Sequence, residues 1–293
     1  MGLVGAGAWA SMVHAPGFAD TPETELTGIW ARRRDAATEL AAPYGVRAFE
    51  RYEELLDVCE AVVFAIPPTI QPEFAVAAAR AGKALLLEKP LAEDVAGAKR
   101  IVDAVHEAGV ASMLALSYRF SQKVKDYLAE ASRFRAFGAR TCFITGALLA
   151  GPFASSPWRH ERNGLLLDLG PHTIDLMEAT LGPVGTVRAG GDPSGMVALI
   201  LEHKSGATSE IVLSGRAGID PKVTVELYGP DGCLTLDASG EPTPVAFESL
   251  RRDFVAVARG GRPNSFDVDH GLHLQQLIED ALQDWDEVAS NRR

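Results

Sequence analysis

The feature that most constrains the fold is a glycine-rich turn near the start of the sequence. A short apolar segment, residues 2–4, leads directly into Gly5-x-Gly7-x-x-Ala10. The two glycines permit a tight turn and a close approach of the backbone to a pyrophosphate, and a small third residue lets the next helix pack closely on the strand. The same residues are compatible with an ordinary strand-to-helix turn. The pattern of strands and helices after the turn distinguishes between these two interpretations.

Alternating strands and helices follow the turn. The apolar runs typical of strands buried on both faces are residues 26–31, 61–66, 84–87 and 110–116. Helices are expected between them at residues 34–42, 72–81 and 91–108. The first is ended by Pro43 and Gly45, and the other two by Gly82 and Gly109. Strands that alternate with helices form a parallel sheet through right-handed crossovers. The sequence therefore predicts a doubly wound Rossmann sheet, and a dinucleotide contacted by Gly5, Ala6, Gly7, Ala8 and Trp9.

Three consecutive arginines begin at Arg32, at the tip of the second predicted strand. An NAD site usually has an acidic residue there, which binds the ribose 2′-hydroxyl. Arg32 and Arg33 lie at a helix N-terminus, where cations oppose the macrodipole and favour a compensating anion. The 2′-phosphate of NADP would supply it, although the arginines can equally be a solvated surface. We therefore expect NADP, slightly preferred, or NAD.

Polar residues follow two of the predicted strands at the edge where ligands bind in such sheets. Pro67 and Gln71 follow the third predicted strand, and Glu88-Lys89-Pro90 follows the fourth. A lysine in that place can polarise a hydroxyl or carbonyl group, or bond the nicotinamide ribose, while Glu88 keeps it charged. The alternative is a surface salt bridge at a helix entry. We expect Pro67, Gln71, Glu88 and Lys89 in the cofactor site and Lys89 in catalysis.

The pattern changes after residue 118. A helix is expected at residues 122–132, and strands at 138–148, 197–203, 209–214, 222–228 and 233–236 with glycine-rich turns and few helices. The sequence thus predicts a Rossmann domain at residues 1–118 and an α+β domain at residues 119–293, for substrate binding and oligomerisation, with an open, mainly antiparallel sheet. Two amphipathic helices at about residues 248–288 are expected to pack against the core, including that of the first domain.

A potential acid–base cluster lies in the second half of the chain. On a helix, Asp168, His172 and Asp175 fall at i, i+4 and i+7 and share one face. A histidine can accept a proton as a hydride leaves, and a carboxylate one turn away can fix its tautomer or bind a hydroxyl group. Because proline is tolerated only in a first turn, Pro171 predicts that the helix begins near Asp168 or kinks there. The alternative is a helix cap with a buried histidine.

Taken together, these motifs resemble the Gfo/Idh/MocA family of glucose-fructose oxidoreductases and inositol dehydrogenases over nearly the whole chain. The resemblance rests on the glycine turn, Pro67-Pro68, Glu88-Lys89-Pro90, Tyr118-Arg119-Phe120, Pro157-Trp158-Arg159 and Asp168-x-Gly170-x-His172-x-x-Asp175. It implies reversible hydride transfer between NAD or NADP and a carbon of a sugar, cyclitol or related polyol. It also implies Lys89 and His172 as the catalytic pair with Asp168 beside them, a cis peptide bond before Pro90, and homo-oligomers formed through the open sheet.

Several departures from the family pattern leave the substrate open, among them Asn163-Gly164-Leu165 in place of a run richer in glycine. Gln71 stands where many relatives have histidine, and Pro171 lies beside the proposed base. A second hypothesis is a regulator that binds the dinucleotide and has lost the chemistry, because a fold does not guarantee activity. The presence of Lys89, Asp168 and His172 argues against it.

Composition excludes several other classes of function. A formal net charge of −11 and a pI near 5.1 oppose binding to nucleic acid, because proteins gain affinity for nucleic acid by neutralising its phosphates.

The three cysteines are far apart and the histidines show no metal-ligand grouping, so we expect reduced thiols and no metal site. We find no signal-peptide pattern and no run of about 20 apolar residues. The expectation is a soluble, cytoplasmic protein that binds no membrane.

Overall fold

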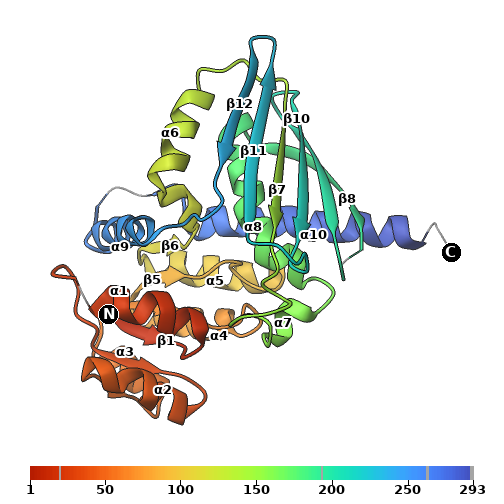
Figure 1. The fold of residues 1–293 in the computed structure, drawn as a ribbon. Coiled ribbons are helices and arrows are strands. Elements are labelled where there is room, and N and C mark those ends of the chain that lie inside the picture. The colour runs from red at the N-terminus through yellow and green to blue at the C-terminus, as the bar shows by residue number, and fades with distance from the viewer. Residues whose placement is uncertain (20, 193, 262–263, 291–293) are drawn as a thin grey trace. The chain divides into compact units, whose positions relative to one another are not determined.

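A computed structural model of the protein describes residues 1–19, 21–192, 194–261 and 264–290 (Figure 1). The chain divides into two compact units. The first consists of Met1–Leu116 and Phe247–His273, and the second of Ser117–Ala246 and Leu274–Arg293. Within the segment expected to form two amphipathic helices, residues 262 and 263 lie outside the described residues.

The first unit contains a six-stranded parallel sheet with the strand order β3-β2-β1-β4-β5-β6. The strands are β1 (Gly2–Val4), β2 (Gly28–Trp30), β3 (Arg47–Ala48), β4 (Ala61–Phe64), β5 (Ala84–Leu87) and β6 (Ser112–Leu114). Every residue of β1, β4 and β5 is buried, which explains why they are continuous apolar runs. The predicted Rossmann sheet is confirmed. Its order reverses between β1 and β4, the place where such sheets bind ligands.

Short helices connect these strands and cover the sheet. They are the π-helix η1 (Ala10–His14), α1 (Ala15–Ala19), α2 (Arg34–Ala41), the 3₁₀ helix η2 (Ala42–Tyr44), α3 (Tyr52–Asp57), α4 (Gln71–Arg80) and α5 (Val95–Ala108). The prediction that α5 begins at residue 91 is wrong. The side chain of Asp94 accepts a hydrogen bond from the backbone N–H of Gly97 at 2.7 Å, which caps the helix and starts it at Val95.

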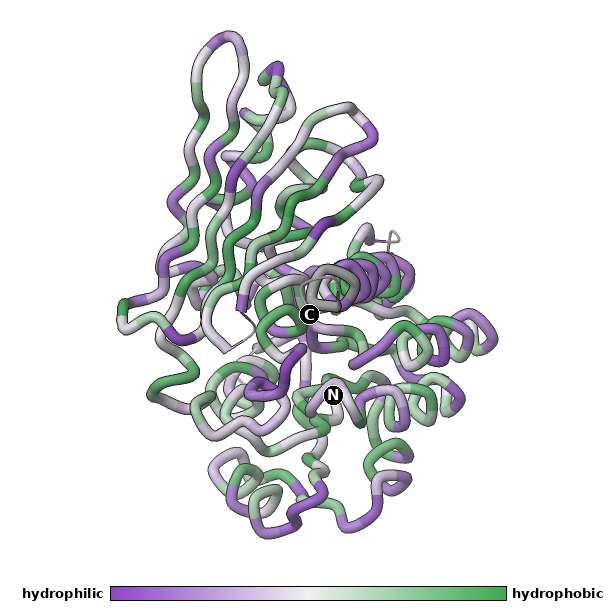
Figure 2. The backbone as a smooth tube through the Cα atoms, turned by 90° about the vertical axis from the view of Figure 1, so that its right-hand side faces the viewer, coloured by the Kyte–Doolittle hydropathy of each residue, from purple (hydrophilic) through white to green (hydrophobic). Residues whose placement is uncertain are grey.

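The second unit contains a mixed sheet with the strand order β12-β11-β7-β10-β9-β8. The strands are β7 (Gly138–Ile144), β8 (Val184–Gly191), β9 (Val197–His203), β10 (Thr208–Ser214), β11 (Lys222–Gly229) and β12 (Gly232–Asp237). All neighbours are antiparallel except β7 and β10, so the predicted mainly antiparallel sheet is confirmed. Hydrophobic and hydrophilic residues alternate along these strands in Figure 2, as expected when only one face is covered.

The helices of the second unit include one that supports the candidate site. The unit contains η3 (Ser117–Phe120), α6 (Gln122–Ala131), α7 (Pro157–His160) and α8 (Gly164–Leu181); α9 (Pro244–Ala258) and α10 (Val268–Ser290) contribute residues to both units. Helix α8 packs on β7, β9 and β10 (Figure 1). The prediction that it begins near Asp168 is wrong. The backbone N–H of Leu167 already donates to the carbonyl of Asn163, so Pro171 lies inside the helix.

Burial explains why α8 tolerates Pro171. The side chains of Leu165, Leu166 and Leu167 are all buried, and α8 is held by packing as well as by its own backbone bonds. Pro171 lacks the N–H that would donate to the carbonyl of Leu167. The hydroxyl of Thr173 adds bonds to the carbonyls of Leu169 and Gly170 in the same part of the helix. One missing backbone bond is therefore offset by tertiary contacts.

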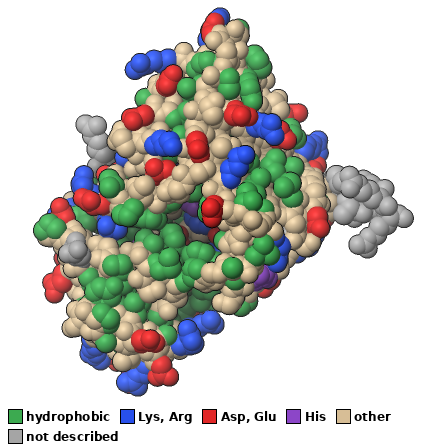
Figure 3. Space-filling view, viewed as in Figure 1, with side chains coloured by type: hydrophobic (Ala, Val, Ile, Leu, Met, Phe, Trp, Pro, Cys, Tyr) green, Lys and Arg blue, Asp and Glu red, His purple; other side chains and the backbone are tan. Residues whose placement is uncertain are grey.

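The described surface shows mixed charge. Lys and Arg side chains alternate with Asp and Glu over the face drawn in Figure 3, and the basic side chains do not merge into one broad patch on that face. None of the described helices has the length and hydropathy needed to cross a membrane. The described residues also contain no group of three or more His, Cys, Asp or Glu arranged to hold a metal ion.

Candidate active site

The glycine turn of the first unit is shaped by one steric constraint and one open space. Gly5 has φ of +121°, and a Cβ atom there would lie 2.3 Å from the carbonyl oxygen of Ala65 at the end of β4. A Cβ atom on Gly7, in contrast, would meet nothing within 4 Å. Ala10 is completely buried, as the third small position of the motif requires. The turn is therefore closed on the side of the sheet and open where a pyrophosphate would approach.

The two arginines after β2 are exposed and carry uncompensated charge. Their neighbour Arg34 forms an ion pair with Glu50. Within the part of the chain that the structure describes, no carboxylate pairs with Arg32 or Arg33. An anion of the cofactor would thus meet two available guanidinium groups at the tip of β2.

The Glu88 carboxylate links the helix after the glycine turn to the end of β5. The indole Nε1 of Trp9 and the imidazole Nε2 of His14 both donate to Glu88 Oε1, at 2.5 and 2.8 Å. The other carboxylate oxygen accepts the backbone N–H of Lys89 at 3.3 Å. Because the side chains of His14 and Glu88 are only 3% and 13% exposed, these bonds are shielded from water and fix the loop after β5.

The side chain of Gln71 is bonded to the backbone of the same loop. Its side chain is 1% exposed, and its Nε2 donates to the carbonyls of Glu88 and Leu91, both at 2.9 Å. Lys89, between these residues, is half-buried at the end of β5, and the peptide bond between Lys89 and Pro90 is cis, which confirms that expectation. Pro67 is half-buried after β4, the neighbouring strand. The sequence-predicted residues of the first unit therefore lie at the carboxyl ends of β1, β2, β4 and β5.

Helix α8 of the second unit carries the histidine and its carboxylates. Asp168 accepts a hydrogen bond from Arg159 Nε at 2.9 Å, and Asp175 accepts one from Arg119 Nη1 at 2.9 Å. The Asp175 side chain is 2% exposed, so Arg119 is needed to balance a buried charge. Asp168 is less buried and lies one turn from His172 on the same face, where it can reach a ligand.

His172 is 7% exposed and lies against an aromatic ring. The Tyr118 ring packs edge-on to the imidazole with a centroid distance of 5.1 Å, and also contacts Phe143. Burial raises the pKa of the Tyr118 hydroxyl, so this residue stays neutral at physiological pH. One face of the His172 environment is thus a neutral, largely apolar ring.

Three residues of this arrangement were not predicted from the sequence as members of the site. His14 bonds Glu88, Arg159 bonds Asp168 and Arg119 bonds Asp175. Arg119 and Arg159 occur in motifs that carry the family resemblance, which was the available signal. No spacing or periodicity connects His14 with Glu88, because 74 positions separate them in the sequence.

Comparison with known proteins agrees with this architecture. Residues 1–116 match the model of the Gfo/Idh/MocA oxidoreductase family with an NAD-binding Rossmann fold, and residues 136–235 match the C-terminal domain of the same family. The chain is 28% identical over 262 residues to dTDP-3,4-didehydro-2,6-dideoxy-alpha-D-glucose 3-reductase of Streptomyces violaceoruber, an alignment that covers 83% of this chain and 73% of that protein. It is 26% identical to scyllo-inositol 2-dehydrogenase (NADP(+)) IolU of Bacillus subtilis (strain 168), over 93% of each chain.

A solved structure shows the same fold. GenD2 from gentamicin A biosynthesis, crystallised in complex with NAD, superposes with a TM-score of 0.87 over 97% of this chain and 93% of that chain. The two sequences are 23% identical, so this similarity concerns the fold alone.

The two glycines of the turn should respond differently to the same substitution. Gly5→Ala should lower the free energy of unfolding by about 2 kcal/mol or more, because the methyl group meets a backbone carbonyl at an unfavourable φ. Gly7→Ala should unfold like the wild type, within about 0.5 kcal/mol, yet bind NADPH and NADH about tenfold more weakly because the methyl group occupies the open space. Urea denaturation and cofactor fluorescence titration measure the two effects. Wild-type stability of the first variant, or wild-type affinity of the second, would contradict this description of the turn.

Proposed function

Because the chain belongs to the Gfo/Idh/MocA family of NAD-binding oxidoreductases, we propose that it transfers a hydride between a nicotinamide cofactor and a secondary alcohol or ketone of a sugar, cyclitol or related polyol. In this proposal residues 1–118 bind the cofactor and residues 119–293 bind the substrate. The observation that carries it is the presence of two sets of potential catalytic groups. Lys89 lies on a loop whose backbone is bonded by Glu88 and Gln71, and His172 lies with Asp168 on α8. The relatives named for sugar and inositol oxidoreductases support the substrate class.

The residues of the first unit fit a dinucleotide. The open space over Gly7 leaves room for a pyrophosphate, and the helix that starts after the turn presents its positive end to it. Arg32 and Arg33 have available charge for a 2′-phosphate, which is why we propose NADP ahead of NAD. When bound, the nicotinamide accepts a hydride from the alcohol or supplies one to the ketone.

The remaining chemistry belongs to side chains of this chain. For oxidation of the alcohol, His172 accepts the hydroxyl proton while the carbon loses a hydride with its two electrons and the C=O double bond forms. The Lys89 ammonium group stabilises the negative charge that develops on the oxygen. Asp168 accepts a hydrogen bond from a neighbouring substrate hydroxyl and keeps its own orientation through Arg159. In the reverse direction the same groups return the proton.

We also propose a cytoplasmic location for this enzyme. Cys59, Cys142 and Cys233 are free thiols in the structure, which suits a reducing compartment.

Removal of either proposed catalytic group should reduce turnover more than cofactor binding. We expect Lys89→Met and His172→Gln to lower kcat by about 10²- to 10⁴-fold, because a charge-stabilising group or a general base is lost. The Kd for NADPH should change by less than about tenfold, which corresponds to 1.4 kcal/mol. Steady-state rates on a panel of inositols and hexoses, with a parallel fluorescence titration, measure both.

Matched controls exist for this pair. Lys83→Met changes a lysine just before β5, at the opposite end of the strand, and His106→Gln changes an exposed histidine of α5. Both controls should keep wild-type rates. If Lys89→Met and His172→Gln turn over a verified substrate as fast as these controls, the assignment is wrong.

The preference for NADP should depend on the arginines after β2. Arg32→Ala and Arg33→Ala should each raise the Kd for NADPH about tenfold and leave the Kd for NADH nearly unchanged, because only NADP carries the 2′-phosphate. Arg51→Ala is the matched control, since Arg51 is an exposed arginine of the same unit that pairs with Glu53. Equal losses for the two cofactors would remove the reason to assign the phosphate to these residues.

We propose, finally, that the chain forms homo-oligomers through the outer face of the second sheet. The strand register places Arg188, Ile200, Glu210, Arg140 and Glu226 in one row across five strands. This row alternates in charge around an isoleucine that is 41% exposed. The same row on a second copy, related by a two-fold axis, would complement it.

This oligomer should depend on the isoleucine of that row. We expect Ile200→Arg to reduce the molar mass in solution to that of a monomer, because it places a charge in the apolar centre of the interface. Ile219→Arg is the control, as Ile219 is 50% exposed in the loop between β10 and β11. Sedimentation velocity measures the mass. A wild-type monomer, or an Ile200→Arg oligomer of unchanged mass, would contradict the proposed interface.

A further inference from the structure

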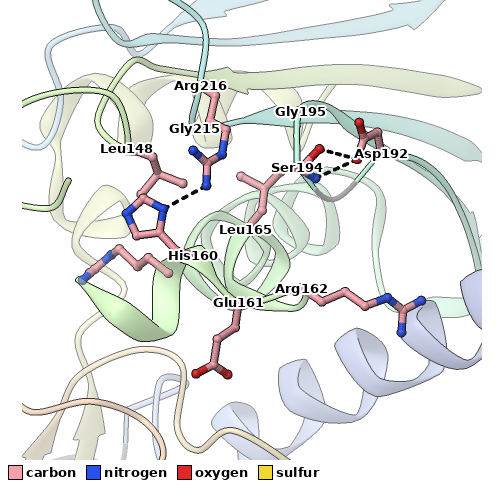
Figure 4. A pocket seen from close by; sticks show the side chains of 11 residues that line it. Leu148, His160, Glu161, Arg162, Leu165, Asp192, Ser194, Gly195, Gly215 and Arg216 are labelled. Carbon is pink, nitrogen blue, oxygen red and sulfur yellow. Dashed lines mark hydrogen bonds between the residues drawn. The ribbon is translucent and has the colours of Figure 1, made fainter. Parts of the chain in front are cut away.

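A pocket of about 230 Å³ lies beside the start of α8 within the second unit (Figure 4). Its walls come from separate segments: His160 of α7, Leu165 of α8, Asp192 of the turn after β8, and Arg216 after β10. The volume is below the range of about 300–1,000 Å³ typical of pockets that enclose a drug-sized ligand. The pocket is therefore suited to a small group or to part of a larger molecule.

Two of the three arginines in this pocket are neutralised by carboxylates. Arg159 pairs with Asp168 at 2.9 Å, and its guanidinium group stacks on the Trp158 ring. Arg162 pairs with Asp286 of α10, and Figure 4 shows its side chain directed toward that helix. Neither arginine has a free positive charge to offer a ligand in the pocket.

The third arginine, Arg216, is held by a neutral partner. Its Nη2 donates to His160 Nδ1 at 2.8 Å, and a guanidinium group can only donate. His160 Nδ1 must therefore be the acceptor, which leaves the proton on Nε2, where it is donated to the carbonyl of Ala154 at 2.6 Å. Within residues 1–19, 21–192, 194–261 and 264–290, no carboxylate pairs with Arg216. Arg216 is thus fixed in place and keeps its full positive charge.

The opposite wall of the pocket accepts hydrogen bonds. Asp192 Oδ1 is held by the backbone N–H and the hydroxyl of Ser194, and these bonds lower the pKa of the carboxyl, so it stays ionised at neutral pH. Glu161 also lines the pocket, but its side chain points away from Arg216 in Figure 4. A ligand with an anionic group at Arg216 and hydroxyl groups toward Asp192 would satisfy both walls.

The pocket also adjoins the proposed catalytic face of α8. Arg159 lines the pocket and bonds Asp168, and Leu165 precedes His172 by seven residues on the same helix. Seven residues correspond to about 10 Å along a helix axis. One polyol with a charged substituent can therefore occupy the pocket and still present a hydroxyl group near His172.

We propose that Arg216, oriented by His160, binds an oxyanion carried by the polyol substrate, a phosphate ester or a carboxylate. This inference rests on the proposed function and adds a substrate class to it. Arginine matches both groups because its planar fork can donate two parallel hydrogen bonds to two oxygens. Neutral sugars and cyclitols would bind without this contact and therefore more weakly.

A titration that needs no turnover tests the proposal. Glucose 6-phosphate, glucuronate, glucose and inorganic phosphate are titrated by calorimetry into the full chain saturated with NADPH. The reduced cofactor occupies its site but cannot accept a hydride, so the sugar alcohols are not oxidised during the titration. We expect at least one of the two charged sugars to bind tenfold or more tightly than glucose. Tighter binding of glucose 6-phosphate would identify the oxyanion as a phosphate ester, and tighter binding of glucuronate would identify it as a carboxylate. Arg216→Gln should weaken that sugar by about 10- to 100-fold, and Arg216→Lys, which keeps the charge without the fork, by less.

Arg135→Gln is the matched control, because Arg135 is an exposed arginine of the same unit that pairs with Asp231. It should bind every ligand like the wild type, and thermal unfolding should show that all variants are folded. Equal binding of charged and neutral sugars, no binding of any oxyanion, or equal losses in Arg216→Gln and Arg135→Gln would overturn the proposal. The proposed function fails separately, when NADPH binds but no polyol or ketone is turned over.

Discussion

The hydrogen bonds accepted by the Glu88 carboxylate are the interaction on which the candidate site depends. They join Trp9 and His14, which follow the glycine turn, to the loop that carries Lys89. Without these bonds the backbone of the loop that carries Lys89 would have more conformations available to it. Because one carboxylate contacts both the segment after the glycine turn and the loop that carries Lys89, a change in the conformation of either segment affects the other. The position of Lys89 is therefore a property of the whole edge of the parallel sheet.

The second unit uses its charges in two distinct ways. Arg119 and Arg159 each pair with a carboxylate of α8, so they balance charge and hold Asp175 and Asp168 in place. Arg216 is instead held by a neutral imidazole, an arrangement that fixes the guanidinium group without cancelling its charge. Paired arginines stabilise a fold, whereas a fixed and unneutralised arginine is available to a ligand. Arg119 and Arg159 therefore support the proposed catalytic face of α8, whereas Arg216 makes the proposed contact with an oxyanion.

The sequence predicts the sheets well because their signals are local. Strands buried on both faces are continuous apolar runs, and Gly5 is required by a backbone conformation that few other residues adopt. Strand β3 was missed because it consists only of Arg47 and Ala48. The start of α8 was misplaced because a local rule for proline cannot account for the burial of the preceding leucines. The pairs formed by His14 with Glu88 and Arg119 with Asp175 join positions 74 and 56 residues apart, so only the folded chain reveals them.

The central proposal is that Lys89 and His172 act on the same oxygen atom of a substrate. A crystal structure of the protein with NADPH and a bound polyol measures this most directly. The account predicts that the Lys89 Nζ atom and one ring nitrogen of His172 both lie within about 3.2 Å of the hydroxyl oxygen on the carbon that faces the nicotinamide. A polyol oxygen contacted by neither group, or Lys89 and His172 bound to separate ligands, would contradict it.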